Sequence, residues 1–297
     1  MLKGIILFFS KEDDLLDTDY SIFRLLEAGR AKNMEMRLVA PKQIELILMP
    51  KKTCLIENGV PMELPDFVIP RIGSATDFHT IAVIRQLEFL GVYVCNSAES
   101  IASVQDKLLM HQLLMQNNLP TPKTAFAKFP VDKNLIEKEI GFPLVIKNVI
   151  STQGNGICMC HDKEQLVDIA ELVSINNKDS HLILQQFLPQ SKGQDLRVFV
   201  VGGEIIGCMY RSSSKSFKAN YSRGGEIKNF DVTPEIERLT LETAELFQLD
   251  VAGIDLLFTG GGFMICEANS APGFVGMEQI TGKIIAEKII DHILTKI

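Results

Sequence analysis

The sequence lacks several features that mark particular classes of protein. Its 297 residues include no tryptophan and no Cys-x-x-Cys pair. The six cysteines all have apolar neighbours, and they are Cys54, Cys95, Cys158, Cys160, Cys208 and Cys266. Reduced thiols in the core of a cytoplasmic protein explain that distribution, so we expect neither a zinc site nor disulfide bonds.

No targeting or membrane signal is apparent near the N-terminus. The first apolar stretch, residues 4–9, is too short to cross a membrane, and no signal-peptide cleavage site follows it. We therefore expect a buried first strand. The net charge of −7 argues against a surface that coats nucleic acid, so we expect neither nucleic acid nor a membrane as a partner.

Common catalytic patterns are absent as well. Neither a Walker loop, which requires Gly-x-x-x-x-Gly-Lys-Ser/Thr, nor a Rossmann glycine fingerprint occurs. No spacing typical of a serine–histidine–aspartate triad appears, and the five histidines show no metal-ligand spacing. The remaining candidates for chemistry are carboxylates, lysines and arginines.

The hydrophobic pattern divides the chain into three parts. Strand and helix signals alternate over residues 1–95, which predicts an α/β domain with a parallel sheet. Ser97 can cap the first helix of a second unit, and Pro120-Thr121-Pro122 indicates a connection between subdomains. Antiparallel hairpins dominate the last third. We expect units at residues 1–95, 96–188 and 189–297.

The sharpest chemical feature is an expected β-hairpin near the C-terminus. Asp255 lies on its first strand, and Glu267 and Asn269 lie on its second. Side chains alternate along a strand, so Glu267 and Asn269 share a face. If Phe258 pairs with Met264 across the turn, Asp255 lies opposite Glu267 on that same face.

These three residues have the chemistry of a magnesium site. Asp255 has apolar neighbours, and buried carboxylates this close repel each other unless a cation lies between them. Carboxylate and amide oxygens are hard ligands that suit magnesium, which retains water and is completed by phosphates. The alternative interpretation is the solvated outer face of an edge hairpin.

A second feature is the loop that follows Lys147. Lys147 ends an apolar strand, and Gly154 and Gly156 lie in the loop that comes next. Glycines let backbone N–H groups approach phosphate oxygens, while a lysine supplies positive charge. An ordinary connection between strands would have a similar composition, so both interpretations stay open.

Basic residues form the third feature. Arg197 and Arg211 lie within or at the end of apolar strands, where an arginine requires an anionic partner. That partner is either a substrate or, within the fold, Asp195 or Glu204. Lys107 by itself is compatible with a solvated helix face. The polar segment 218–225 fits either a binding loop or a plain connection.

In their order along the chain, these segments resemble the RimK-type ligases of the ATP-grasp superfamily, which add L-glutamate to the C-terminus of a ribosomal protein. The resemblance begins at about Val68, and the earlier residues match only in their α/β pattern. The matching motifs are Val68-Ile69-Pro70-Arg71-Ile72-Gly73, Asn96-Ser97, Asp106-Lys107, Thr152-Gln153-Gly154, Gly193-Gln194-Asp195-Leu196-Arg197, Asn220 with Arg223-Gly224-Gly225, Val251-Ala252-Gly253-Ile254-Asp255 and Glu267-Ala268-Asn269-Ser270-Ala271-Pro272-Gly273-Phe274, with Gly276, Glu278 and Thr281-Gly282 trailing.

The resemblance implies a fold and a set of cofactors. An α/β pre-ATP-grasp domain with a parallel sheet would precede an α+β ATP-grasp fold, whose two subdomains bind ATP between them. Two magnesium or manganese ions would be held by Asp255, Glu267 and Asn269. The residues implied to contact the nucleotide are Lys107, Lys147, Gly154, Gly156, Gln186, Phe187, Asp195, Lys218, Ala219 and Asn220.

The resemblance also implies a reaction. A carboxylate attacks the γ-phosphate to give an acyl phosphate, and an amine then displaces phosphate to form an amide. Lys147, Arg211 and Arg223 would stabilise the charge that moves during transfer. Arg71, Arg211 and Arg223 would clamp a glutamate or an acidic peptide tail.

Expected partners are ATP, L-glutamate or another amino acid, and an acidic protein tail or a small carboxylate acceptor. We also expect a homo-oligomer. Two alternatives stay open. One is a ligase that makes a dipeptide-like amide of the lysine-carrier, citrylglutamate or N-acetylaspartylglutamate type. The other is a nucleotide-binding homologue that keeps the fold without turnover.

Overall fold

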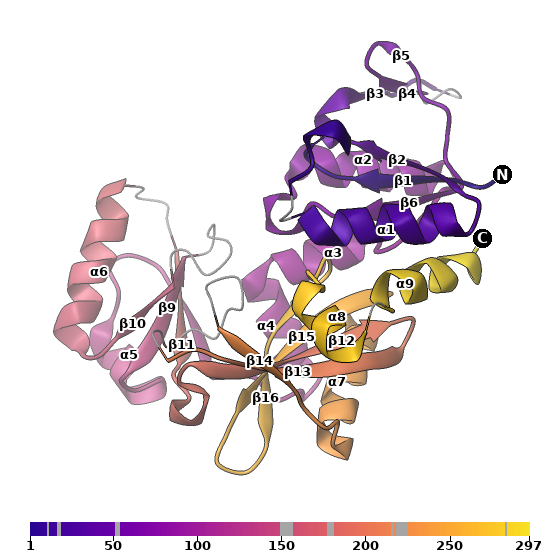
Figure 1. Cartoon of the computed structure of the whole chain (residues 1–297). Coiled ribbons are helices and arrows are strands. Elements are labelled where there is room, and N and C mark those ends of the chain that lie inside the picture. The colour runs from indigo at the N-terminus through magenta and orange to yellow at the C-terminus, as the bar shows by residue number, and fades with distance from the viewer. Residues whose placement is uncertain are drawn as a thin grey trace.

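The computed structural model describes residues 1–10, 12–16, 19–50, 54–148, 157–176, 181–214, 217, 225–282 and 284–297. Three sheet-containing regions are arranged around a central helix, α4 (Figure 1). The N-terminal domain lies above the C-terminal sheet in that view, and the central sheet lies to one side. None of the helices in the described ranges combines the length and apolar composition that a membrane crossing requires.

The N-terminal domain contains the parallel sheet that the sequence predicts. Its strand order is β2-β1-β6-β7, and every described pair in it is parallel. The bounds are β1 Lys3–Leu7, β2 Glu35–Val39, β6 Phe67–Pro70, β7 Tyr93–Val94, α1 Tyr20–Ala31 and α2 Phe78–Phe89. The apolar side of α1 is buried and includes Ile22, Leu25 and Leu26.

A small antiparallel sheet is attached to this domain. It consists of β3 (Ile44–Ile47), β4 (Cys54–Glu57) and β5 (Val60–Pro61). The sequence Glu57-Asn58-Gly59 predicts a hairpin turn, and the structure has one between β4 and β5, with Asn58 and Gly59 at φ 50° and 82°. Two consecutive positive φ angles are typical of the tight hairpin turns that favour Asn-Gly.

Helices α3 (Ala98–Gln105) and α4 (Lys107–Gln116) connect the N-terminal domain to the rest of the chain. Ser97 caps α3 by accepting a hydrogen bond from Ser100 N, as expected. The apolar positions Ile101, Val104 and Leu108 predict one helix that continues through Leu108, but the chain becomes extended at Asp106 (φ −76°, ψ 97°). Asp106 caps α4, so Lys107 is the first residue of a new helix.

The central sheet is antiparallel, with the order β10-β9-β11-β8. Its elements are β8 Thr124–Ala127, α5 Lys133–Glu139, β9 Leu144–Asn148, β10 Ile157–Cys160, α6 Lys163–Asn176 and β11 Leu182–Gln186. The pattern of apolar residues predicts strands at residues 144–147, 157–160 and 182–187 and a helix at residues 163–175, which correspond to β9, β10, β11 and α6. It did not identify β8 or α5, which are short and carry few apolar residues at regular spacing.

The C-terminal sheet has five antiparallel strands in the order β14-β13-β12-β15-β16. The elements are β12 Gln194–Val201, β13 Glu204–Ser212, β14 Glu226–Asn229, α7 Pro234–Leu246, β15 Val251–Phe258, β16 Phe263–Asn269, α8 Val275–Thr281 and α9 Ile285–Leu294. The pair Gly202-Gly203 predicts a hairpin turn, and in the structure it forms the turn between β12 and β13, with positive φ at both glycines.

The two faces of this sheet differ in what covers them. Leu196, Val198 and Val200 of β12 pack in one apolar cluster with residues of α4 and α7. Alternate residues point to the opposite face. There, Phe199 and Val201 pack with α8, α9 and α1, which joins the N-terminal domain to the C-terminal sheet. The other end of that face carries charged residues.

Candidate active site

One face of the C-terminal sheet carries charged side chains on four neighbouring strands. Residues that pair directly across strands point to the same face, so their side chains form a row. The pairs in this row are Asp195 with Arg211, Arg197 with Asp255, Asp255 with Glu267, and Gly253 with Asn269.

The turn of the last hairpin differs from the expected register by one residue. Phe258 pairs with Phe263, not with Met264. The turn is closed by a hydrogen bond of 2.9 Å from Thr259 N to Gly262 O. A register continued from this turn without interruption would place Asp255 opposite a different residue from the one expected.

A β-bulge corrects this register beside the charged row. The pairing shifts between Asp255 and Leu256, which leaves Cys266 as the extra residue on β16. Beyond the bulge Asp255 lies opposite Glu267, so the expected pairing is confirmed although the expected turn register is wrong. Bulges are common beside active sites, where they redirect side chains.

Two arginines bind the carboxylates of this row. Arg197 donates to both oxygens of Asp255, with Nη2 2.7 Å from Oδ2. Arg211 binds Asp195 through Nε and Nη2 at 2.7 and 2.8 Å, and its Nη2 lies 3.0 Å from Asp255 Oδ2. The pairing of Arg211 with Asp195 is therefore confirmed, whereas Glu204 pairs with Lys288 instead.

The alternation of cations and anions keeps Asp255 ionised although it is buried. Burial alone would raise its pKa, but the charges of Arg197 and Arg211 lower the pKa of Asp255 to about 2. Arg197 and Arg211 thus supply positive charge to Asp255 from the side of β12 and β13, whereas Glu267 lies on its other side. Both oxygens of Asp195 accept hydrogen bonds from Arg211. If Asp195 also contacts the nucleotide, as the resemblance implies, it would do so while it is bound to Arg211.

Glu267 and Asn269 complete the row on β16. Asn269 Nδ2 donates to Gly253 O at 3.2 Å and to Glu267 Oε1 at 3.3 Å. These bonds orient the amide, so its carbonyl oxygen points away from both acceptors. One amide and two carboxylates on one sheet face have the donor chemistry of a magnesium site.

The described residues contain no group of three His, Cys, Asp or Glu side chains close enough to hold a metal ion. A metal in this row would therefore depend on the amide oxygen of Asn269 and on oxygens from a bound phosphate. That requirement agrees with the preference of magnesium for partial coordination by substrate.

Two lysines from outside the C-terminal sheet lie near β16, since Lys107 interacts electrostatically with Glu267 and Lys147 with Cys266. Lys147 lies near the end of β9 and is 7% exposed. Burial and the charge of Lys147 lower the pKa of Lys107, while the charge of Glu267 raises it. Lys107 is also the first residue of α4, where the N–H groups of Leu108 and Leu109 donate to the capping carboxylate of Asp106. Lys107, Lys147 and Glu267 thus belong to one electrostatic environment.

Gln186 and Phe187 lie where the chain leaves the central sheet. Gln186 is the last residue of β11, and its N–H donates to Lys123 O at 2.9 Å. The next strand, β12, begins at Gln194 and carries Asp195. Gln186 and Phe187, which the resemblance implies to contact the adenine of the nucleotide, therefore lie at the junction between the two sheets. Six other expected site residues lie outside the described residues: Gly154, Gly156, Lys218, Ala219, Asn220 and Arg223.

Arg71 reaches from the N-terminal domain to the loop that follows Asn269. Its Nη2 donates to Pro272 O at 2.7 Å, and its guanidinium lies 5.7 Å from the centre of the Phe274 ring. Its Nε is buried and has no hydrogen-bond partner among the described residues. Burial lowers the pKa of Arg71 to about 10. The buried Nε of this half-buried side chain is thus one donor that remains for an anionic group.

Asn96 fixes the ends of both strands that carry the carboxylates. Its Nδ2 donates to Val251 O and Ser270 O, each at 2.7 Å, and its Oδ1 accepts from Val251 N at 2.9 Å. Val251 begins β15, and Ser270 directly follows Asn269. The sequence placed Asn96 in a matching motif but assigned it no role in the site.

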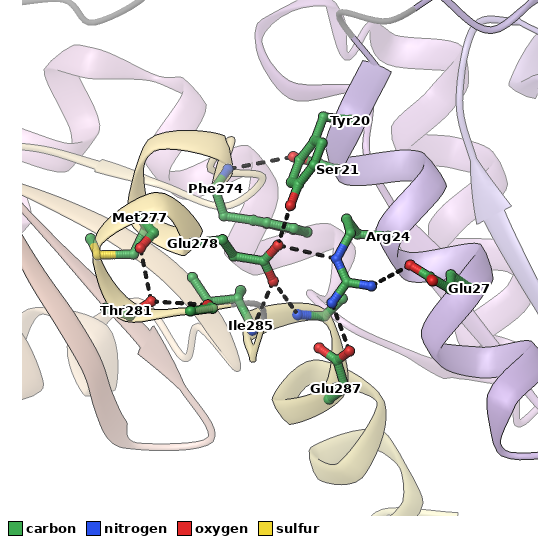
Figure 2. Close-up of polar contacts among 12 residues, drawn as sticks. Tyr20, Ser21, Arg24, Glu27, Phe274, Met277, Glu278, Thr281, Ile285 and Glu287 are labelled. Carbon is green, nitrogen blue, oxygen red and sulfur yellow. Dashed lines mark hydrogen bonds and ion pairs between the residues drawn. The ribbon is translucent and has the colours of Figure 1, made fainter.

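A buried ion cluster joins α1 to α8 and α9 (Figure 2). Glu278 accepts hydrogen bonds from Tyr20 Oη at 2.8 Å, Arg24 Nε at 3.2 Å and Ile285 N at 3.0 Å. Arg24 also binds Glu287 at 2.6 Å. Sequence reasoning missed Arg24, whose only signal is an arginine within the apolar side of a helix. These contacts hold α1, which belongs to the same N-terminal domain as Arg71, against α8 and α9.

Family models and curated proteins match almost the whole chain. Residues 6–101 match a family described as the RimK PreATP-grasp domain, and residues 104–293 match the RimK-like ATP-grasp domain. A probable alpha-L-glutamate ligase of Pseudomonas fluorescens is 37% identical over 276 residues, which cover 92% of this chain and 91% of that protein. One of Pseudomonas aeruginosa is 36% identical over the same shares.

Solved structures with similar folds agree with these matches. A RimK domain ATP-grasp protein from Sphaerobacter thermophilus aligns with a TM-score of 0.75 at 19% identity, covering 98% of each chain. The D-alanine–D-alanine ligase of Bacillus anthracis complexed with ATP aligns at 0.70 and 18% identity, covering 99% of this chain and 96% of that one. The expected fold class is confirmed. The chain belongs to the RimK-like ATP-grasp family of ligases.

Proposed function

We propose that the protein uses ATP to join L-glutamate to the C-terminal carboxylate of a protein or peptide. The observation that carries the proposal is the row from Arg211 to Asn269, which shares one electrostatic environment with two lysines. The curated relatives named probable alpha-L-glutamate ligases support glutamate as the amine.

ATP would bind between the central and the C-terminal sheets. Lys107 and Lys147 would hold its phosphates, and Gln186 and Phe187 would contact adenine. The remaining residues proposed for nucleotide are Asp195, Gly154, Gly156, Lys218, Ala219 and Asn220. The structure of the ATP-grasp ligase PsnB complexed with Mg and ADP supports this choice of cofactor, since its fold aligns with a TM-score of 0.70.

Asp255, Glu267 and Asn269 would hold magnesium or manganese, two ions in this proposal. When bound, such ions neutralise the charge on the phosphates. The donor set fits this role because its three oxygen ligands share a face and leave coordination positions for phosphate oxygens.

The proposed reaction has two steps. First, an oxygen of the acceptor carboxylate bonds to the γ-phosphorus of ATP, and the bond to the β–γ bridging oxygen breaks, which gives an acyl phosphate and ADP. The glutamate amine then attacks the acyl carbon, loses a proton and displaces phosphate, leaving an amide. Lys147, Arg211 and Arg223 would stabilise the moving negative charge.

Arg71, Arg211 and Arg223 would bind the carboxylates of glutamate or of an acidic tail. The unpartnered Nε of Arg71 supports this assignment, since a buried donor requires an acceptor. A peptide acceptor is supported by the neighbour PsnB, which was solved with a precursor peptide. A ligase that makes a dipeptide-like amide differs only in the acceptor. The expected homo-oligomer stays a prediction.

Incubation with ATP, magnesium and a panel of amino acids tests the proposal, with phosphate release and product mass as readouts. We expect glutamate to stimulate ADP formation when an acidic peptide is present, with a mass gain of one glutamyl residue on the peptide. If glutamate stimulates no reaction with a peptide or a small carboxylate, the glutamate assignment is wrong. ADP binding then tests the nucleotide site separately.

A further inference from the structure

A buried chain of hydrogen bonds crosses the junction between the two sheets. At its centre is His111, which lies on α4 and is 2% exposed. Its Nε2 lies 3.0 Å from Gln185 Nε2, and its Nδ1 lies 2.8 Å from Thr121 Oγ1. Helix α4 runs between the central and the C-terminal sheets (Figure 1).

One arm of this chain leads into the central sheet. Gln185 Nε2 lies 3.0 Å from Thr124 Oγ1, and that hydroxyl donates to Pro122 O at 2.8 Å. A carbonyl oxygen only accepts, so the direction of this arm is fixed from its end. The Gln185 amide group therefore donates twice, once to Thr124 and once to His111 Nε2.

The other arm leads to the C-terminal sheet. The hydroxyl of Thr121 donates to Ile265 O at 2.9 Å, so Thr121 accepts its second hydrogen bond from His111. Nδ1 of His111 then carries the proton, and Nε2 is the acceptor. Burial and the charge of Lys147 lower the pKa of His111 to about 3, which agrees with a neutral ring.

The chain of hydrogen bonds lies beside residues proposed for the nucleotide at one end and for the metal at the other. His111 follows Lys107 by four residues on α4, so both lie on one side of the helix. Gln185 directly precedes Gln186. Ile265 lies two residues before Glu267, next to the bulge in β16. The chain thus links the adenine end, a phosphate lysine and the metal end.

We propose that His111 is a positioning residue that sets the adenine-binding end of β11 relative to the metal-binding end of β16. The proposal rests on the proposed function of the nucleotide site. His111 does not touch the nucleotide in this proposal. It acts through Gln185 on one side and through Thr121 on the other.

Two conservative substitutions separate these arms. In His111→Asn the side-chain amide nitrogen takes the place of Nδ1, so the bond to Thr121 is kept and the bond to Gln185 is lost. In His111→Gln the amide oxygen reaches the place of Nε2, so the bond to Gln185 is kept and the bond to Thr121 is lost. His79→Asn is the matched control, because His79 contacts Pro41 O and Ile44 O within the N-terminal domain.

Isothermal titration calorimetry with ADP, at several magnesium concentrations, measures both effects. We expect His111→Asn to weaken ADP binding without magnesium by roughly tenfold, as loss of one acceptor for a buried donor implies. We expect His111→Gln to keep that affinity but to raise, severalfold, the magnesium concentration for half-maximal enhancement. His79→Asn should match the parent in both measurements.

Thermal unfolding of each variant distinguishes positioning from a general structural role. The proposal is wrong if folded variants keep parental ADP affinity and magnesium dependence, or if both variants lose both properties in proportion to stability. If the His111 variants do not fold, Thr124→Val and Thr121→Val remove the outer hydroxyl of each arm and should give the same two separate effects. A parent protein that binds no ADP would refute the proposed nucleotide site itself.

Discussion

At the scale of single residues, Asp255 determines the chemistry of the site. Its carboxylate is 4% exposed and accepts from two guanidinium groups. Removing one partner of a buried ion pair leaves the other charge uncompensated. The same carboxylate is a proposed metal ligand, so substitutions at Asp255 combine a stability effect with a catalytic effect.

Asp255→Asn should lower magnesium-dependent ADP formation about 100-fold, because a charged metal ligand is lost. It should also lower the free energy of unfolding by about 3 kcal/mol, because Arg197 and Arg211 lose a counter-charge. Steady-state assays and urea denaturation measure the two effects. Glu204→Gln is the control, since its ion pair with Lys288 is exposed. If Asp255→Asn formed ADP at the parental rate, the metal assignment would be contradicted.

The lowered pKa of Asp255 also predicts how stability depends on pH. The folded-state pKa is about 2 against an ordinary value of 3.8, so the unfolded chain takes up this proton first as the pH falls. The contribution of Asp255, about 2 kcal/mol, is therefore fully present above about pH 5 and is lost as the pH falls toward 2.

Urea denaturation of the parent and of Asp255→Asn at stepped pH values between 7 and 3 measures this contribution. The difference in unfolding free energy between the two proteins should shrink as the pH decreases through the range in which the unfolded carboxyl is protonated. A difference that stays constant down to pH 3 would show that Asp255 is not stabilised as an anion by its arginines.

At the scale of secondary structure, the apolar pattern determined most elements, and packing determined the details. Alternation along β16 was enough to place Glu267 and Asn269 on one face, whereas Asp255 lies opposite Glu267 only because the bulge offsets the turn register. The bulge at Cys266 was not predictable, because an inserted residue leaves the surrounding alternation almost unchanged. The break at Asp106 was also missed, since an aspartate is tolerated within a helix but is preferred at its start.

The cluster around Glu278 makes a prediction for the contact between α1 and α8. Arg24 and Glu278 have side chains that are 7% and 1% exposed, and Glu278→Gln removes the most buried counter-charge of Arg24 while Glu27 and Glu287 remain. We expect a loss of about 2 kcal/mol in unfolding free energy, because charged hydrogen bonds to a buried carboxylate are lost. Arg30→Gln on the same helix is the control, because its pair with Glu12 is exposed and should contribute less than about 1 kcal/mol.

Chemical denaturation of both variants compares these two ion pairs. Equal stability losses would indicate that the Glu278 cluster is no more important than a surface pair. Arg24→Lys adds a second comparison: a lysine keeps the charge but cannot donate from several nitrogens to Glu278 and Glu287 at once. It should lose an intermediate amount of stability.

At the scale of the whole molecule, the proposed site draws on all three regions of the chain. In this proposal, the C-terminal sheet supplies the carboxylates, the central sheet supplies Lys147, and the N-terminal domain supplies Arg71. This division follows from the resemblance to a known family and stays a prediction. The contacts that join the regions, such as those of Arg24 and Asn96, could not be read from the sequence, because their partners lie 150 or more residues away.

Arg71→Gln tests whether the N-terminal domain contributes to substrate binding. Arg71 contacts the loop after Asn269 but none of the residues proposed for adenine. We therefore expect the affinity for ADP to stay at the parental value, while the KM for glutamate or for the acceptor rises about 10- to 100-fold through loss of a charged hydrogen bond.

Calorimetry with ADP and steady-state kinetics with varied substrate measure these two properties of Arg71→Gln. Arg37→Gln is the control, because Arg37 pairs with Glu57 within the N-terminal domain. A parental KM for every substrate would remove Arg71 from the proposed binding site.

The shared core of α1 and α9 has a consequence for biosynthesis. Ile22 and Leu25 pack in one cluster with Ile289, Ile290 and Ile293, near the opposite end of the chain. During translation the N-terminal domain leaves the ribosome well before α9 has been synthesised, so the part of α1 that packs against α9 stays uncovered until residues 285–293 are available. A nascent chain that stalls before Ile285 would therefore expose the apolar side of α1 to chaperones and proteases.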